Sequence, residues 1–124
     1  MFFARIAAVA ALSLALAAPA PAQRAAQTIY VWSFNFSPRP IQLAAGKPVT
    51  LTFVNRSGSG HDFTAKEFFA SSRILAGSAP EGEIELRGGQ TKSVTLIPAR
   101  GTYKARCTHF LHAAMGMTDR IIVN

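Results

Sequence analysis

Alternating apolar and polar residues are the dominant pattern of this chain. The clearest case is Val49–Asn55, where Val49, Leu51 and Phe53 fall on one face of a strand and polar residues fall between them. Further short stretches are rich in β-branched or aromatic residues, which favours strands: residues 29–34, 41–43, 83–86, 93–96, 102–107 and 120–123. Clusters of proline, glycine and serine separate them. About seven short strands with a turn between each pair predict an antiparallel β-sandwich.

Residues 102–107 predict where the only cysteine of the chain points. Side chains alternate across a strand, so Ala105 and Cys107 lie on one side while Lys104 and Arg106 lie on the other. The charged side faces water, and we therefore expect the thiol to face inward with the core.

Residues 64–75 interrupt the strand pattern. They show no alternation, and the segment Lys-Glu-Phe-Phe-Ala at residues 66–70 has a helical appearance. We expect a short helical excursion around residues 64–75, packed across the end of a sheet with Phe68 and Phe69 in the core.

The first 22 residues have the features of a cleaved signal peptide. Arg5 gives a positive start, residues 6–18 are apolar or small, and Ala20-Pro21-Ala22 has the small-x-small form of a cleavage site. The apolar run is shorter than the roughly 20 residues of a transmembrane helix, so we expect no stable membrane anchor. The prediction is an exported protein, periplasmic or secreted, with a loose leader at residues 23–27 and a single domain over residues 23–124.

The predicted mature chain is basic. Without Arg5 it carries 12 Lys and Arg against 6 Asp and Glu, which favours acidic partners or surfaces. The basic residues are scattered singly and form no stripe, and this argues against nucleic acid as a partner.

Potential metal ligands are concentrated in residues 107–117, CTHFLHAAMGM. This stretch holds the only cysteine, two of three histidines and two of three methionines. Oxidising compartments favour paired cysteines, so an unpaired one in an exported protein suggests an intermolecular partner, a reactive thiol or a bound metal. A third imidazole, His61, follows the turn at residues 57–60.

Two imidazoles and a thiolate in a plane, with a weak axial thioether, form the electron-transfer site of blue copper. Zinc also takes Cys and His, but a thioether contributes little to zinc, so the methionines favour copper. A buried structural thiol is a further alternative, which export and the nearby histidines disfavour. A Cys-His nucleophile pair lacks an orienting third group, and we expect no enzyme.

The mature chain resembles the cupredoxins, the small blue copper proteins that include plastocyanin, pseudoazurin and azurin. The resemblance rests on SGSGHDF around His61, GTYKARC leading to Cys107, and CTHFLHAAMGM as a ligand loop. It implies an all-β fold, a Greek-key antiparallel β-sandwich, with one copper ion per chain held where two loops meet.

By this resemblance His61, Cys107 and His112 are the equatorial ligands and Met117 is the axial one, with Met115 as the alternative. Asp62 stands where the family often has Asn. We expect Asp62 to accept a hydrogen bond from Thr108, and its negative charge would favour Cu(II). His109, between the ligands, is expected to be solvent-facing or hydrogen-bonded.

The resemblance implies a monomeric electron carrier that cycles between Cu(II) and Cu(I), with His112 as the exit for the electron. An apolar docking patch would be formed by Phe110, Leu111, Ala113 and Ala114, and the positive charge of the chain would steer acidic redox partner proteins. The alternative is a periplasmic copper chaperone or buffer that delivers the ion to acceptor proteins without electron-transfer turnover. A metal-free interaction module is the third possibility.

Overall fold

The regular elements of the chain begin at Ala25 and end at Val123. The structure, a computed structural model, describes residues 13–17, 25–110 and 112–124. The predicted signal peptide and its cleavage site fall almost entirely outside the described residues, as does Leu111. Within the described part, no helix is long and apolar enough to cross a membrane.

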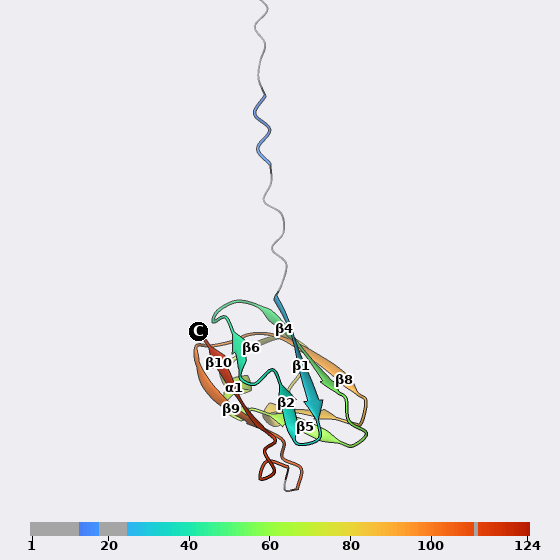
Figure 1. Ribbon diagram of the computed structural model, residues 1–124. Helices are drawn as coiled ribbons and strands as arrows, with labels where there is room; N and C mark the ends of the chain where they lie inside the picture. The colour runs from blue at the N-terminus through green and yellow to red at the C-terminus, as the bar shows by residue number, and fades with distance from the viewer. Residues whose placement is uncertain (1–12, 18–24, 111) are drawn as a thin grey trace, which may run out of the picture.

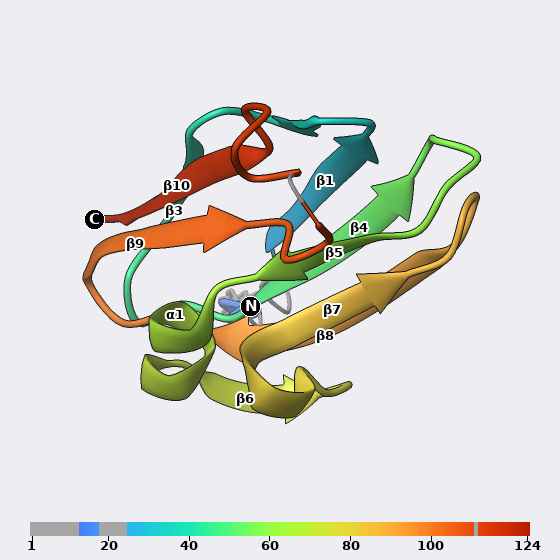
Figure 2. The same cartoon turned by 90° about the horizontal axis from the view of Figure 1, so that it is seen from below.

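Two five-stranded sheets form a sandwich (Figures 1 and 2). One sheet has the order β2-β1-β4-β8-β6 and the other β3-β10-β9-β5-β7. Their strands are β1 Ala25–Trp32, β2 Asn35–Ser37, β3 Ile41–Leu43, β4 Val49–Asn55, β5 His61–Thr64, β6 Arg73–Ala76, β7 Glu83–Leu86, β8 Thr91–Ile97, β9 Gly101–Arg106 and β10 Thr118–Val123. The all-β sandwich expected from the sequence is confirmed.

Most strand pairs are antiparallel, but each sheet also contains one parallel pair. β1 runs parallel to β4, with Ala25 opposite Val49, and β10 runs parallel to β3. The alternation in the sequence cannot distinguish the two directions, because both expose side chains with period two.

The alternating positions face the core between the sheets. Val49, Leu51 and Phe53 are at most 5% exposed, as their pattern predicts. Large side chains fill the centre, and Phe36 and Phe53 both contact the ring of Phe63. This packed interior fixes the directions in which the strands leave the sandwich.

Several elements differ from their predicted bounds. The leader expected to be loose at residues 23–27 is in the first strand from Ala25 onward, because its backbone pairs with β4. The strand expected at residues 29–34 ends at Trp32, where Ser33 and Phe34 turn the chain into β2.

The helical excursion expected around residues 64–75 is shorter than predicted. Helix α1 covers Lys66–Ser71 and buries Phe68 and Phe69, as expected, whereas Thr64 ends β5 and Arg73–Ala76 forms the edge strand β6. A 3₁₀ turn at Pro80–Gly82 leads into β7.

Two loops are brought together by this topology. The β4–β5 loop leads to His61, and the β9–β10 loop carries residues 107–117; β5 and β9 are neighbours in the same sheet. The β9–β10 loop projects from the lower end of the sandwich in Figure 1, away from the C-terminus.

Candidate metal centre

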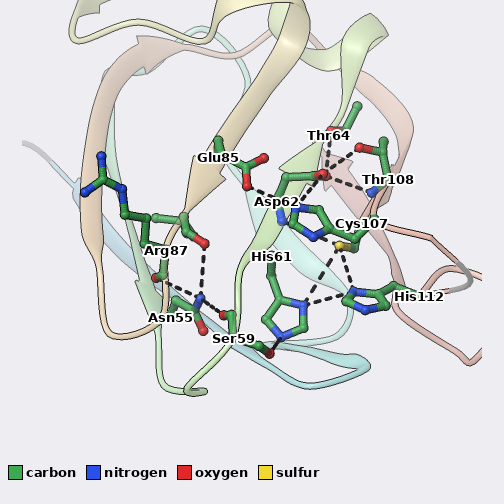
Figure 3. A network of polar contacts seen from close by, with 12 residues as sticks. Asn55, Ser59, His61, Asp62, Thr64, Glu85, Arg87, Cys107, Thr108 and His112 are labelled. Atoms are coloured by element: carbon green, nitrogen blue, oxygen red, sulfur yellow. Dashed lines mark hydrogen bonds and ion pairs between the residues drawn. The ribbon is translucent and has the colours of Figure 1, made fainter.

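His61 is held in place by the loop that precedes it. The Nδ2 amide of Asn55, which is 1% exposed, donates to the carbonyls of Ser59 at 2.8 Å and Arg87 at 2.9 Å. Its Oδ1 accepts from the backbone N–H of Ser57 at 3.0 Å. These bonds tie the β4–β5 loop to the end of β7 (Figure 3). They thereby fix the position of His61, which follows this loop as the first residue of β5.

Glycine is required where this loop meets its neighbour. A Cβ on Gly88 would lie 2.7 Å from the backbone carbon and oxygen of Gly58. A side chain at residue 88 would therefore push the His61 loop away from the sheet.

Cys107 lies directly after β9 and is fully buried, as the alternation predicts. Its backbone N–H donates to the carbonyl of Met117 at 3.1 Å, which closes the ligand loop at its base. The backbone N–H of Asp62 lies 3.5 Å from the sulfur and donates to it. The thiol is thus tied to both loops.

The donor atoms of His61, Cys107 and His112 converge (Figure 3). The two Nδ1 atoms are 3.1 Å apart, and the sulfur lies 3.4 Å from Nδ1 of His112 and 4.0 Å from Nδ1 of His61. Two imidazole nitrogens and one sulfur at these separations can share one ion. The sequence predicts that His61 lies close to Cys107 and His112, and the structure confirms this.

The environments of His61 and Cys107 favour the binding of a metal ion. Burial lowers the pKa of His61, and the charges of His112 and His109 lower it further, so the ring stays neutral and its nitrogen keeps a free lone pair. Burial raises the pKa of the Cys107 thiol, while backbone hydrogen bonds from Asp62 and His109 act against that rise. A thiolate here therefore needs a cation beside it.

Ser59 orients the first imidazole. Its hydroxyl oxygen lies 3.2 Å from Nε2 of His61, the ring nitrogen that points away from Cys107. When Nε2 carries the proton and donates to Ser59, Nδ1 is left free for a metal. Nothing in the sequence pattern distinguishes this serine from the others of its loop.

Asp62 links the two ligand loops through its side chain. Its Oδ1 accepts from the N–H of Thr108 at 2.9 Å and from the hydroxyl of Thr64 at 2.8 Å, and its Oδ2 accepts from the hydroxyl of Thr108 at 2.5 Å (Figure 3). The expected hydrogen bond between Asp62 and Thr108 is present, and a second one joins the same two residues. The carboxylate is 1% exposed, so its charge lies in a weakly screened environment.

The two methionines of the ligand loop are in different environments. Met117 is fully buried, and its backbone N–H donates to the carbonyl of His112 at 3.0 Å. Met115 is 60% exposed. With His61, Cys107 and His112, the buried Met117 completes the arrangement of a type 1 copper site, and this donor set of two imidazoles, a thiolate and a thioether fits copper.

The surface around His112 is apolar and partly different from the predicted patch. Phe110 is 87% exposed, Ala114 is exposed and Ala113 is half-buried, while Leu111 lies outside the described residues. Phe34, absent from the sequence prediction, packs its ring edge-on against His112 with centroids 5.1 Å apart. It comes from the β1–β2 turn and has a φ of 64°.

His109 lies beside the ligand cluster, and its Nε2 is directed to Glu85. Its Nε2 lies 3.0 Å from Oε1 of Glu85, in agreement with the expectation that this histidine is hydrogen-bonded. Its ring stacks on that of His112 with centroids 5.5 Å apart.

Comparison with protein families matches residues 25–124 to the copper binding proteins of the plastocyanin/azurin family. Among solved structures, auracyanin B is 21% identical with a TM-score of 0.58, covering 85% of this chain and 93% of that one. Dithionite-reduced auracyanin from Roseiflexus castenholzii is 20% identical with a TM-score of 0.61, covering 84% and 99%. These likenesses concern the fold. A search of curated proteins finds no significant match.

Proposed function

Because this chain belongs to the plastocyanin/azurin family of copper-binding proteins, we propose that it is an exported electron carrier. Copper, when bound, supplies a one-electron couple between Cu(II) and Cu(I). The proposed ligands are His61, Cys107 and His112, with Met117 rather than Met115 in the axial position. The convergence of the two Nδ1 atoms and the sulfur within 4.0 Å of one another carries the proposal.

The residues around the ligands favour electron transfer without large rearrangement. Asn55 and Asp62 brace the two loops through hydrogen bonds that do not depend on a metal. A site held in one geometry limits the reorganisation that accompanies a change of oxidation state. This bracing supports the electron carrier over the copper chaperone, whose site must open to release its ion.

His112 is the proposed route for the electron. It is half-buried, whereas His61 and Cys107 are 1% and 0% exposed. The apolar residues around it, Phe34, Phe110, Ala113 and Ala114, form the proposed docking patch. A small apolar contact suits the brief encounters of redox partners.

Basic residues on the two strands that border the β9–β10 loop support an acidic partner. Lys104 and Arg106 are exposed on β9, and Arg120 lies opposite Lys104 on β10. Charge of one sign on one face speeds association with an oppositely charged partner, and salt weakens the effect. A Lys104→Glu, Arg106→Glu variant should react several-fold more slowly with hexacyanoferrate at low salt. Lys47→Glu should change the rate little, because Lys47 lies in the turn before β4, near the C-terminus and away from the β9–β10 loop.

The proposed mature protein is a monomer of residues 23–124 in the periplasm or outside the cell. The first described strand and the family match both begin at Ala25, shortly after the proposed cut at Ala22. Mass spectrometry of the exported protein should give an N-terminus at Gln23.

The optical and spin-resonance spectra of the copper-loaded protein test the central proposal. We expect intense thiolate-to-copper absorption in the visible region that is absent from Cys107→Ala. A colourless Cu(II) complex would refute it. Reversible reduction with fast self-exchange supports the carrier, whereas transfer of Cu(I) to an acceptor protein without electron turnover would support the chaperone.

A further inference from the structure

A second group of potential metal ligands lies beside the copper ligands but faces the other way. On the outer side of the β5–β7 pair, Asp62 lies directly opposite Glu85, and Glu83 is two residues along the same strand. Like charges directly opposite each other on a sheet are destabilising. Among the described residues, the ion pairs of Asp62 and Glu85 are with His109 and not with any Lys or Arg.

His109 places an imidazole nitrogen over these carboxylates. Its Nε2 lies 3.0 Å from Oε1 of Glu85 and 3.7 Å from Oδ2 of Asp62. All three donor atoms lie within 4.8 Å of one another. Ligand atoms around a zinc ion are roughly 3.3 Å apart, given bonds of about 2.0–2.1 Å in a tetrahedron, so the two separations from Nε2 of His109 need only small adjustments.

The imidazole of His109 is fixed on two sides. One face stacks on His112, with an interplanar angle of 23°. A Cβ on Gly60 would lie 3.3 Å from Cε1 of the ring, so this glycine leaves just the space that the ring fills. A ring held between two neighbours loses little freedom when a ligand binds.

Asp62 keeps one acceptor position for a ligand. A carboxylate offers about four lone-pair sites, and Oδ1 uses two of them on Thr64 and Thr108. Oδ2 accepts from the Thr108 hydroxyl alone. Its remaining position is on the atom that lies 3.7 Å from Nε2 of His109.

Negative charge is crowded at this place. Glu83 and Glu85 lie on the same face of β7, and Glu85 is directly opposite Asp62 on β5. A divalent cation would relieve this crowding better than the single charge of a protonated imidazole.

We propose that Asp62, Glu85 and His109 form a second metal site, which takes a borderline divalent cation of the Zn²⁺ or Cu²⁺ class. Two carboxylate oxygens and one imidazole nitrogen suit these ions, and a hard cation such as Mg²⁺ would not select the imidazole. The side chain of Glu85 is 50% exposed and that of His109 33% exposed, so the ion can enter from solvent and keep a water ligand. Asp62 connects this site to the copper centre, since its backbone N–H donates to the Cys107 sulfur.

Zinc retention by the copper-loaded protein tests the second site. The protein is equilibrated with Zn²⁺ and desalted, and both metals are counted by mass spectrometry. We expect about one zinc per chain in addition to copper, with X-ray absorption showing only oxygen and nitrogen neighbours around zinc. Zinc gained at the expense of copper, zinc with a sulfur neighbour, or no zinc retained would each overturn the proposal.

Variants assign the zinc to these residues. A Glu85→Gln, His109→Ala variant should bind zinc at least tenfold more weakly while it still binds one copper ion with intense visible absorption, which shows that the fold is intact. Glu67→Gln, a carboxylate on α1, is the matched control and should retain zinc. Equal retention by the double variant and the parent would contradict the assignment.

A Cys107→Ala background separates this proposal from the proposed copper function. Cys107 is not part of the second site, so Cys107→Ala protein should still lose zinc affinity when Glu85→Gln and His109→Ala are added. If those two substitutions changed nothing in this background, the second site would be excluded whatever the copper centre does.

Discussion

Asn55 shows how one buried side chain can decide the position of a metal ligand. Its amide connects the β4–β5 loop to the end of β7 through bonds to Ser57, Ser59 and Arg87. Replacing it with alanine would remove the partner of three part-buried backbone groups, and a fully buried group left unpaired costs about 1–3 kcal/mol. We expect Asn55→Ala to lower the free energy of unfolding by about 2–4 kcal/mol in denaturant titrations.

The same substitution should also loosen the His61 loop, so the copper-loaded protein should lose its visible absorption more readily under a copper chelator. Thr52→Ala is the control, because it removes a hydroxyl contact with Ser93 near the surface at 3.0 Å. If both variants were equally stable, the bracing role of Asn55 would be wrong.

Asp62 sets the charge next to the thiolate. Asp62→Asn removes one negative charge but leaves an oxygen that accepts from Thr64 and Thr108. A buried negative charge favours Cu(II) over Cu(I), so its loss should raise the reduction potential by tens of millivolts, where about 59 mV is a tenfold change for one electron. Voltammetry in zinc-free buffer measures this, with Glu67→Gln as a charge-matched control. A lower potential would mean that hydrogen bonding, and not charge, controls the couple.

The ligands themselves were predictable from the sequence, but their supporting residues were not. Cys107 and His112 are separated by four residues on one loop, so local spacing reveals them, and His61 is found through the strand end and turn around it. Ser59, Asn55 and Phe34 act through contacts between segments distant in the chain. Serine and asparagine are common in turns for local reasons, which hides their role here.

The β1–β2 hairpin shapes the surface over the second imidazole. Phe34 occupies the second position of its two-residue turn with a φ of 64°, a conformation that costs a residue with a Cβ about 1–2 kcal/mol. Its ring covers one edge of His112. The turn thus has an aromatic residue at a position where glycine or asparagine would adopt the same backbone conformation at a lower free-energy cost.

Replacing this ring tests whether the hairpin belongs to the docking patch. Phe34→Gly should change the free energy of unfolding by less than about 1 kcal/mol, because relief of the backbone offsets the lost contact. The electron self-exchange rate, measured by NMR line broadening, should fall several-fold because apolar docking surface is lost. Leu75→Ala, on the distant edge strand β6, should leave the rate unchanged. An unchanged rate in Phe34→Gly would remove the hairpin from the patch.

Strands with strong alternation were predicted well, whereas strands that depend on neighbours were not. β4, β7 and β3 have their predicted bounds. β6 is an exposed edge strand that exists because it pairs with β8, and residues 25–27 are in a strand because they pair with β4. Such pairing uses backbone groups, which every residue carries, so the side-chain pattern gives no sign of it.

At the scale of the whole molecule, two buried titratable groups give the folding stability opposite pH dependences. Burial lowers the pKa of the His61 imidazole below its usual value of 6.5. The contribution of His61 to the folding stability is therefore complete above about pH 6.5 and is lost as the pH falls below it. Burial raises the pKa of Asp119, an acid, from 3.8 to about 6, against the opposing effects of the Arg120 backbone and the Arg39 and Arg120 charges. Its Oδ2 has no hydrogen-bond partner among the residues that the structure describes, and the residue is 4% exposed.

Asp119 should therefore make the protein less stable at neutral pH than it could be. Because the folded state binds this proton more tightly than the unfolded state, stability falls as the pH rises from about 4 to about 6, by up to about 3 kcal/mol. Asp119→Asn stays neutral throughout, so we expect it to be about 1–3 kcal/mol more stable than the parent at pH 7 and equal to it near pH 4. Denaturant unfolding of both metal-free proteins across this range gives the difference, in which the His61 contribution cancels. A constant difference at every pH would show that Asp119 is ionised in the folded protein as readily as in the unfolded chain, and its burial would then need a counter-charge from Arg39 strong enough to balance desolvation.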